Sequence, residues 1–145
     1  MSVRFNESPG FLIDRSAHML RMRARAKLAD LGIDLTTEEM IILVALNKND
    51  GQRIGDLAAL LQRDNTTLTR QIESLEKKGC VRRKSAPDDR RAVQVFLKKK
   101  GVRYFESFDP EMRAFRDQML SGLSETEQKL LTACLRKIQA NLSSL

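Results

Sequence analysis

The fold is constrained most by two short amphipathic segments that lie almost end to end between residues 54 and 77. Apolar side chains recur in each at the spacing of one helix face, and only about four residues separate the two segments. The apolar positions are Ile54, Leu57, Ala58 and Leu61 in the first segment, and Leu68, Ile72 and Leu75 in the second. Asp64 or Asn65 supplies an N-cap for the second helix. Small Ala58 and Ala59 stand where the helices must cross, so the pattern predicts a helix-turn-helix.

Two β-prone segments, Cys80 to Lys84 and Ala92 to Leu97, follow the second helix. Alternate residues of the later segment are Val93, Val95 and Leu97, so one of its sides can be buried. The turn between the segments contains Pro-Asp-Asp-Arg-Arg. We therefore expect a hairpin wing on the helix-turn-helix, in a mainly α protein with a small β-hairpin (α+β, winged helix-turn-helix).

Longer helices are expected on both sides of this region. Residues 8–31 carry one apolar stripe, and a capping box at Thr36 and Glu39 predicts a helix from Thr37 to about Asn47. After Gly101 the chain returns to helix, with Pro110 either starting a helix or kinking one. A capping box at Ser124 opens a last helix whose buried side should comprise Leu130, Leu131, Cys134, Leu135, Ile138 and Leu142. The helices at both ends of the chain therefore carry apolar stripes that need a partner.

The positive charge is confined to the middle of the chain. Residues 63–100 hold twelve Lys and Arg against five Asp and Glu, and 12 − 5 equals the whole net charge of +7. Confining the excess to about a quarter of the chain favours a polyanionic partner. Basic residues on the first helix also permit a membrane-surface interpretation, which Asp14 and Asp30 disfavour because they interrupt the pattern.

Other classes of function find little support. At 145 residues the chain is expected to form one domain. No apolar run is long enough to cross a bilayer and no secretory segment follows Met1, so we expect a cytoplasmic protein without membrane contact. His18 is the single histidine, and we expect no metal, no cofactor and no enzymatic activity. Cys80 and Cys134 are expected to be ordinary thiols, with a redox switch as the open alternative.

The polar face of the second short helix is a candidate DNA-reading surface. Its hydroxyls can donate to or accept from base edges and phosphates, and an arginine can bind guanine O6 and N7 together. Threonine is a poor helix former, so three of them in the first turns bring no structural benefit. Glu73 would repel phosphate unless Arg70 or Lys77 pairs with it. The candidate residues on this helix are Thr66, Thr67, Thr69, Arg70 and Lys77.

The turn of the hairpin suits a second contact. An extended arginine can enter a narrow, A·T-rich minor groove, where the negative potential is concentrated. A neighbouring carboxylate can orient that arginine, and Pro87 stiffens the approach. The alternative is a soluble turn with local charge pairing, and this segment alone does not separate the two interpretations.

The stretches "LTTEEMIIL" and "TLTRQIESLEKKGCVRRKSAPDDRRAVQV" resemble the MarR family of winged helix-turn-helix transcriptional regulators. The resemblance implies a homodimer held together by its terminal helices. It also implies binding to a pseudopalindromic operator in double-stranded DNA, usually with repression, and release by a small, often aromatic or phenolic, ligand. Lys98 stands where the family usually has Thr, and the first helix lacks the cysteine of peroxide-sensing members.

By position, the resemblance assigns Thr66, Thr67, Thr69 and Arg70 to the major groove. It assigns Arg91 to the minor groove, with Asp89 supporting it and Arg90 on phosphate or sharing its role. It further implies a DNA-binding lobe at residues 36–100 and a helical dimerisation region formed by residues 8–32 and 101–145. His18, Met22, Ile42 and Phe108 are conceivable pocket residues, although we favour a core role for each. The remaining alternative is a sequence-tolerant architectural or RNA-binding winged-helix protein.

Overall fold

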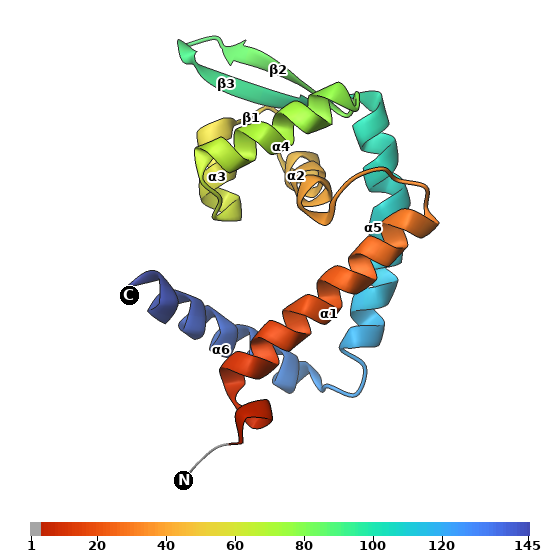
Figure 1. Ribbon diagram of the computed structural model, residues 1–145, viewed down its shortest axis with the longest axis vertical. Coiled ribbons are helices and arrows are strands. Elements are labelled where there is room, and N and C mark those ends of the chain that lie inside the picture. The colour runs from red at the N-terminus through yellow and green to blue at the C-terminus, as the bar shows by residue number, and fades with distance from the viewer. Residues whose placement is uncertain (1–3) are drawn as a thin grey trace. The chain divides into compact units, whose positions relative to one another are not determined.

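A computed structural model describes residues 4–145 of the chain. The elements in chain order are η1 (Phe5–Glu7, a 3-10 helix), α1 (Pro9–Asp30), α2 (Thr37–Lys48), β1 (Gln52–Arg53), α3 (Ile54–Leu61), α4 (Asn65–Lys77), β2 (Val81–Ala86), β3 (Asp89–Leu97), α5 (Lys99–Met119) and α6 (Glu125–Ser143) (Figure 1). The chain divides into two compact units, Met1–Pro110 and Glu111–Leu145. The predicted class, mainly α with a small sheet in a winged helix-turn-helix, is confirmed.

The helix starts follow the local capping chemistry that the sequence predicts. The Ser8 side chain accepts a hydrogen bond from the Phe11 amide at the start of α1, and Pro9 occupies the first helical position. The capping box before α2 is complete, because Thr36 and Glu39 each bond to the other's backbone amide. Gly32, at a φ of 67°, follows the end of α1.

Helices α3 and α4 form the predicted helix-turn-helix. The turn runs from Gln62, in the left-handed conformation, to Asp64, which caps α4. Ala58 is buried as expected, whereas Ala59 is exposed, so only one of the two alanines lies where the helices cross. Three wholly buried residues, Leu68, Ile72 and Leu75, hold α4 on the core.

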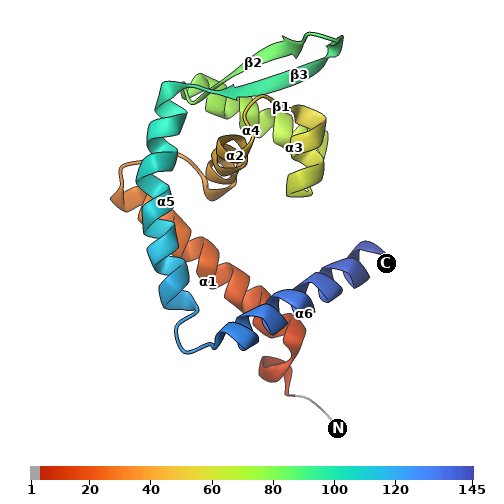
Figure 2. The ribbon, with the colours of Figure 1, turned by 180° about the vertical axis from the view of Figure 1, so that it is seen from behind.

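The wing is larger than the sequence indicated. Strand β1 was not expected, and it pairs with β3 to give a three-stranded antiparallel sheet in the order β1-β3-β2. The hairpin strands also run further than expected, so that only Pro87 and Asp88 form the turn between them. Both ribbon views show the hairpin lying along α4 (Figures 1 and 2). Strand β1 is only two residues long, so the sequence shows no alternation that could predict it.

The core of the lobe lies between α2, the helix-turn-helix and the sheet. Its wholly buried side chains are Ile42, Leu43, Leu46, Leu57, Leu68, Ile72, Leu75, Cys80, Val81 and Val95. Burying one such aliphatic side chain contributes about 1.5–3 kcal/mol to the free energy of folding. The lobe therefore has an apolar core of its own.

One charged residue lies in that core. Glu39 is 3% exposed, and its carboxylate accepts hydrogen bonds from the Thr36 amide, the Ser74 hydroxyl and the Lys78 ammonium. Burial alone would raise the pKa of Glu39, but these hydrogen bonds together lower it below its usual value. Ser74 and Lys78 belong to α4 and its C-cap, so the buried carboxylate ties α2 to the second helix of the helix-turn-helix.

The long helices settle one open alternative and differ from the expectation in one respect. Pro110 lies inside α5, so the alternative in which it starts a helix is excluded. The apolar stripe of α6 is not buried within the chain, since Leu130 is 62% exposed and Leu142 is 63% exposed. Leu131 and Cys134 are also exposed, and Leu135 and Ile138 are half-buried. Among residues 4–145, no helix is long and apolar enough to cross a membrane.

Gly101 can be tested as a packing constraint. A Cβ at this position would lie 2.4 Å from the Cys80 carbonyl oxygen, which is backbone and cannot move away freely. We expect Gly101→Ala to lower the free energy of unfolding by about 1–3 kcal/mol, measured by urea denaturation at fixed protein concentration. Gly10→Ala is the control, because a Cβ at Gly10 meets nothing within 4 Å. Equal stability of the two variants would contradict the close approach.

The two cysteines should differ in reactivity. Cys80 is wholly buried, and desolvation raises the pKa of its thiol, so little thiolate is present near neutral pH. We expect iodoacetamide to leave Cys80 unmodified in the folded protein and to alkylate it in urea, as read by peptide mass spectrometry. Cys134, which is exposed on α6, serves as the internal comparison. Rapid alkylation of Cys80 in the folded protein would contradict its burial and favour a redox role for this thiol.

Candidate nucleic-acid interface

The predicted reading face of α4 is accessible. Because Leu68, Ile72 and Leu75 pack into the core, the opposite side of α4 faces solvent. Thr66, Arg70 and Lys77 are exposed, and Thr67 and Thr69 are half-buried. Three of the five predicted helix residues are therefore open to solvent on this side of the lobe, and the other two lie on its flanks.

The start of α4 has a defined cap. Asp64 accepts hydrogen bonds from the Thr67 amide at 2.7 Å and from the Thr67 hydroxyl at 2.8 Å. These two bonds lower the pKa of Asp64, which keeps the carboxylate ionised at the helix N-terminus. The Thr67 hydroxyl thus donates to the cap, whereas no such bond engages the Thr66 hydroxyl among the described residues.

The ion-pair partner of Glu73 lies outside the set of residues predicted from the sequence. Glu73 pairs with Arg83 of β2 at 3.6 Å, and not with Arg70 or Lys77. The Arg83 guanidinium also donates two hydrogen bonds to Glu76, whose carboxylate accepts a third from the Arg83 amide. These contacts lower the pKa of Glu76. Arg83 therefore fastens the wing to α4, and Arg70 and Lys77 form no direct ion pair with a carboxylate of the described chain.

The contact between Arg83 and α4 follows from the alternation of side chains along β2. Residues 81, 83 and 85 of β2 share one side of the sheet, and Val81 on that side is wholly buried. An arginine two residues after a buried valine must point toward the helix beneath. The two-residue period could have indicated this contact, had the neighbouring helix been known.

The other predicted residues lie on β3, just beyond the turn. Asp89, Arg90 and Arg91 are all exposed. The Asp89 carboxylate accepts a hydrogen bond from the Arg91 amide at 2.9 Å, so it organises the backbone next to the turn. The carboxylate of the turn itself, Asp88, forms an ion pair with Arg53 at the end of β1.

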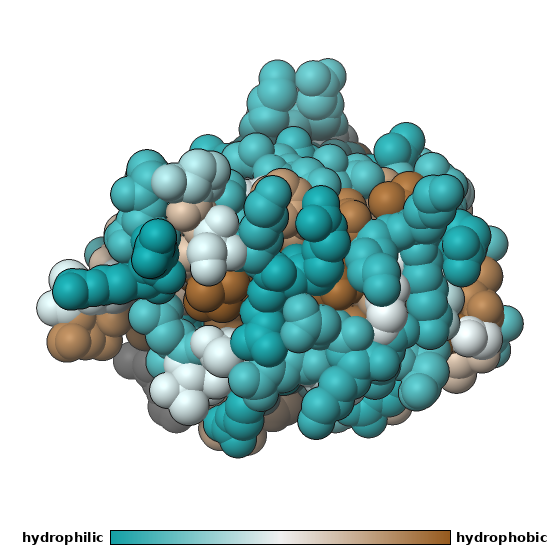
Figure 3. Space-filling view, turned by 90° about the horizontal axis from the view of Figure 1, so that it is seen from above, coloured by the Kyte–Doolittle hydropathy of each residue, from teal (hydrophilic) through white to brown (hydrophobic). Residues whose placement is uncertain are grey.

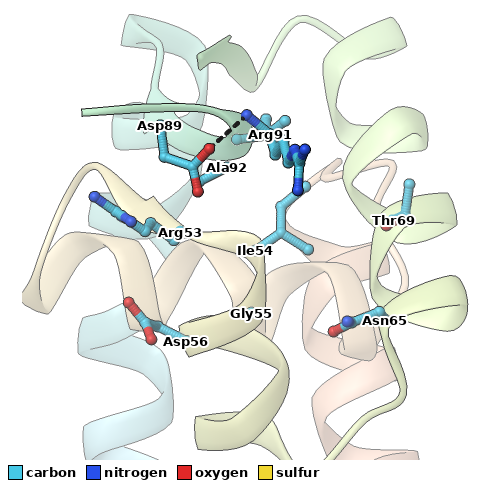
Figure 4. A pocket seen from close by; sticks show the side chains of 10 residues that line it. Arg53, Ile54, Gly55, Asp56, Asn65, Thr69, Asp89, Arg91 and Ala92 are labelled. Carbon is cyan, nitrogen blue, oxygen red and sulfur yellow. Dashed lines mark hydrogen bonds between the residues drawn. The ribbon is translucent and has the colours of Figure 1, made fainter. Parts of the chain in front are cut away.

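An open pocket of about 420 Å³ lies between the helix-turn-helix and the wing. Figure 4 shows Arg91 and Asp89 on the wing side of this pocket, and Asn65 and Thr69 on the side of α4. The start of α3 completes the lining, with Arg53, Ile54, Gly55 and Asp56. The pocket thus brings together predicted residues of the helix and of the wing, whereas Lys77 lies at the far end of α4.

The side of the lobe that carries the wing is mostly hydrophilic (Figure 3). Only small apolar areas interrupt the polar surface in that view. Together with the charge excess in residues 63–100, this surface suits a hydrated polyanion better than an apolar partner.

The residues considered for an effector pocket do not gather into one lining. Ile42 and Phe108 are buried, as a core role requires, but His18 and Met22 are exposed on α1, so a core role is wrong for them in the single chain. Within the part of the chain that the structure describes, no group of three His, Cys, Asp or Glu side chains could hold a metal ion.

Comparisons of the sequence with a family model and with known proteins agree on one family. A family model described as "MarR family" matches residues 35–93. The HTH-type transcriptional regulator MhqR of Bacillus subtilis (strain 168) is 31% identical over 107 residues, covering 72% of this chain and 72% of MhqR. The transcriptional repressor MprA of Escherichia coli (strain K12) is 28% identical over 114 residues, covering 79% of this chain and 65% of MprA.

Solved structures agree with this result. The chain is similar to the crystal structure of the S. aureus MepR-DNA complex, with a TM-score of 0.85 and 26% identity over 93% of this chain and 96% of that one. The crystal structure of the transcriptional regulator SlyA gives a TM-score of 0.81 and 26% identity, over 91% of this chain and 92% of the other. The matched region contains the helix-turn-helix, and the relatives regulate transcription. The chain therefore belongs to the MarR family and is a winged-helix, DNA-binding regulator of transcription.

Proposed function

We propose that this protein is a homodimeric repressor that binds a pseudopalindromic operator and is released by a small ligand. In this proposal α4 enters the major groove and the wing reaches the neighbouring minor groove. The observation that carries it is the common pocket, where Thr69 of α4 and Arg91 of the wing line the same open surface. A helix and a hairpin that border one surface can contact adjacent grooves of one duplex.

In the major groove, the exposed first turns of α4 would read the bases. Arg70 is exposed and forms no direct ion pair among the described residues, so its guanidinium is available for a guanine edge. Thr66 and Thr69 supply hydroxyls near the helix N-terminus, where the helix dipole favours phosphate. Lys77, at the other end of the helix, is assigned to a backbone phosphate.

In the minor groove, Arg91 would be the inserted side chain and Arg90 a phosphate contact. The hydrogen bond from the Arg91 amide to Asp89 supports this assignment, since it fixes the backbone from which the arginine extends. Asp89 therefore orients the strand at Arg91, and the guanidinium stays available for DNA.

The proposed dimer rests on the two terminal helices. Helix α6 exposes Leu130, Leu131 and Leu142, and α1 exposes Leu12, Ile13, Met19, Leu20 and Met22. Apolar area of this extent on both helices favours burial against a second copy of the chain. A dimer also doubles the number of base pairs read, with half-sites about 10 base pairs apart or a multiple of that spacing.

The ligand is the part of the proposal that rests on the family alone. The resemblance implies a small aromatic or phenolic effector, and no residue is assigned to it here. A set of phenols and aromatic acids, added to the protein–operator complex, is the direct test. Release of the DNA at unchanged salt concentration identifies an effector, and binding unaffected by every member removes this chemical class.

If the wing enters the minor groove, truncation of the Arg91 side chain should lower the affinity for the operator. With an operator selected from genomic fragments, we expect Arg91→Ala to weaken binding by more than about ten-fold at fixed salt, because a minor-groove contact is lost. Fluorescence anisotropy measures the affinity, and Arg116→Ala, which removes an exposed arginine outside the basic region, is the control. Unchanged binding would refute the wing assignment.

The same titrations separate the proposal from its alternative. Log affinity should fall steeply with log salt concentration, by about 0.9 for each phosphate contact. A regulator should prefer its operator strongly over random duplex DNA, whereas an architectural or RNA-binding protein would bind operator, random duplex and RNA with similar affinity. A salt slope near zero would remove the electrostatic argument.

If α6 forms part of the dimer interface, a charged substitution should disrupt dimerisation on the apolar side of this helix only. Leu130→Glu places a charge on the exposed apolar stripe, and we expect a monomer by sedimentation velocity together with loss of operator binding. Ala140→Glu is the matched control, because Ala140 is exposed on the other side of the helix. A Leu130→Glu protein that remains dimeric would show that another surface joins the protomers.

A further inference from the structure

Arg53 occupies a position where its residue type is unfavourable for the local structure. It precedes α3 as the N-cap, and its side chain makes no capping hydrogen bond. Ser, Thr, Asp and Asn are preferred at this position, and a positive charge near a helix N-terminus opposes the helix dipole. Arg53 therefore forgoes a stabilising cap, which indicates that its side chain serves another purpose.

That side chain reaches the turn of the wing. The Arg53 Nη2 atom donates to Asp88 Oδ1 across 35 positions of sequence, in an ion pair of 2.5 Å. The pair raises the pKa of Arg53 and lowers the pKa of Asp88, so both groups stay ionised at physiological pH. Asp88 lies three residues before Arg91, at the tip of the same hairpin.

The rest of the wing is held in other ways. At its root, Gly51 and Asp50 bond to β3 through the Gly51 amide and the Asp50 carboxylate. Near its middle, Arg83 fastens β2 to Glu73 and Glu76. Among the residues that the structure describes, the Arg53–Asp88 pair is the one side-chain hydrogen bond that ties residues 84–91 to another element.

We propose that Arg53 is a positioning residue for DNA recognition: its ion pair with Asp88 holds the tip of the wing where Arg91 can enter the minor groove. The proposal rests on the function proposed above. An exposed ion pair contributes little to overall stability, and Arg53 and Asp88 are 40% and 69% exposed. Its effect is therefore local, since it restricts a hairpin tip that has few other contacts.

A direct phosphate contact by Arg53 is the competing explanation, and the two make opposite predictions for Asp88. If Arg53 binds phosphate, Asp88→Asn frees the arginine and removes a negative charge, so DNA binding should strengthen. If the pair positions the wing, Asp88→Asn should weaken binding although the protein becomes more positive. The sign of the change in affinity therefore distinguishes the two roles.

The experiment compares operator affinities of the full-length protein at fixed salt. We expect Arg53→Ala and Asp88→Asn each to weaken binding by about two- to five-fold, the range that an exposed ion pair can supply. The variant with both changes should lose no more than either single variant, because both remove one pair. Arg53→Lys, which keeps the charge, and the exchanged pair Arg53→Glu with Asp88→Arg should recover most of the affinity. Urea midpoints should stay at the wild-type value.

A second arm asks whether Arg53 acts through Arg91. In an Arg91→Ala background, Arg53→Ala and Asp88→Asn should cause no further loss, since the side chain that they position is absent. An equal loss in both backgrounds, or tighter binding by Asp88→Asn, would overturn the positioning role. If Arg91→Ala itself binds normally, the minor-groove assignment fails, and the positioning role of Arg53 fails with it because it depends on that assignment. If Arg91→Ala is weakened but the Arg53 and Asp88 variants are not, only the positioning role fails.

Discussion

The structure depends on the burial of one side of α4. Leu68, Ile72 and Leu75 are wholly buried, so rotating the helix about its axis would expose several leucine-sized side chains to water. That cost fixes which side of the helix faces solvent. The polar residues on the opposite side are accessible because of this apolar packing. Their own interactions contribute little to the orientation of the helix.

Polar contacts then fix the surroundings of α4. Glu39 binds Ser74 and Lys78 at one end of the helix, and Arg83 binds Glu73 and Glu76 beside it. The first set joins α4 to α2 and the second joins it to the wing. Buried or multidentate hydrogen bonds of this kind are directional, whereas apolar packing alone tolerates small shifts. Groove recognition requires such fixed directions, because a bidentate contact to a base edge has a narrow geometry.

Much of this arrangement could be predicted from the sequence, because it is determined locally. The capping boxes at Thr36 and Ser124 and the apolar stripe of α4 are set by residues a few positions apart. The alternation expected in β3 is weaker, because Val95 is buried but Val93 and Leu97 are only half-buried. The missed features are non-local: β1 is two residues long, and the partners Arg83–Glu76 and Arg53–Asp88 meet only once the hairpin is placed. The expectation that Arg70 or Lys77 pairs with Glu73 is wrong for the same reason, because the actual partner, Arg83, lies on the neighbouring strand.

The exposed leucines of α6 show that the sequence signal is also incomplete for the assembly of protomers. The periodicity correctly marked one apolar side of the helix, but it could not say whether that side is buried within the chain or against a second chain. Leu130 and Leu142 remain more than half exposed, while the core around α4 is complete without them. The lobe has an apolar core of its own, whereas the terminal helices expose apolar side chains. In the proposed dimer, each lobe would read a half-site, and pairing of the terminal helices would set the distance between the two lobes on the duplex.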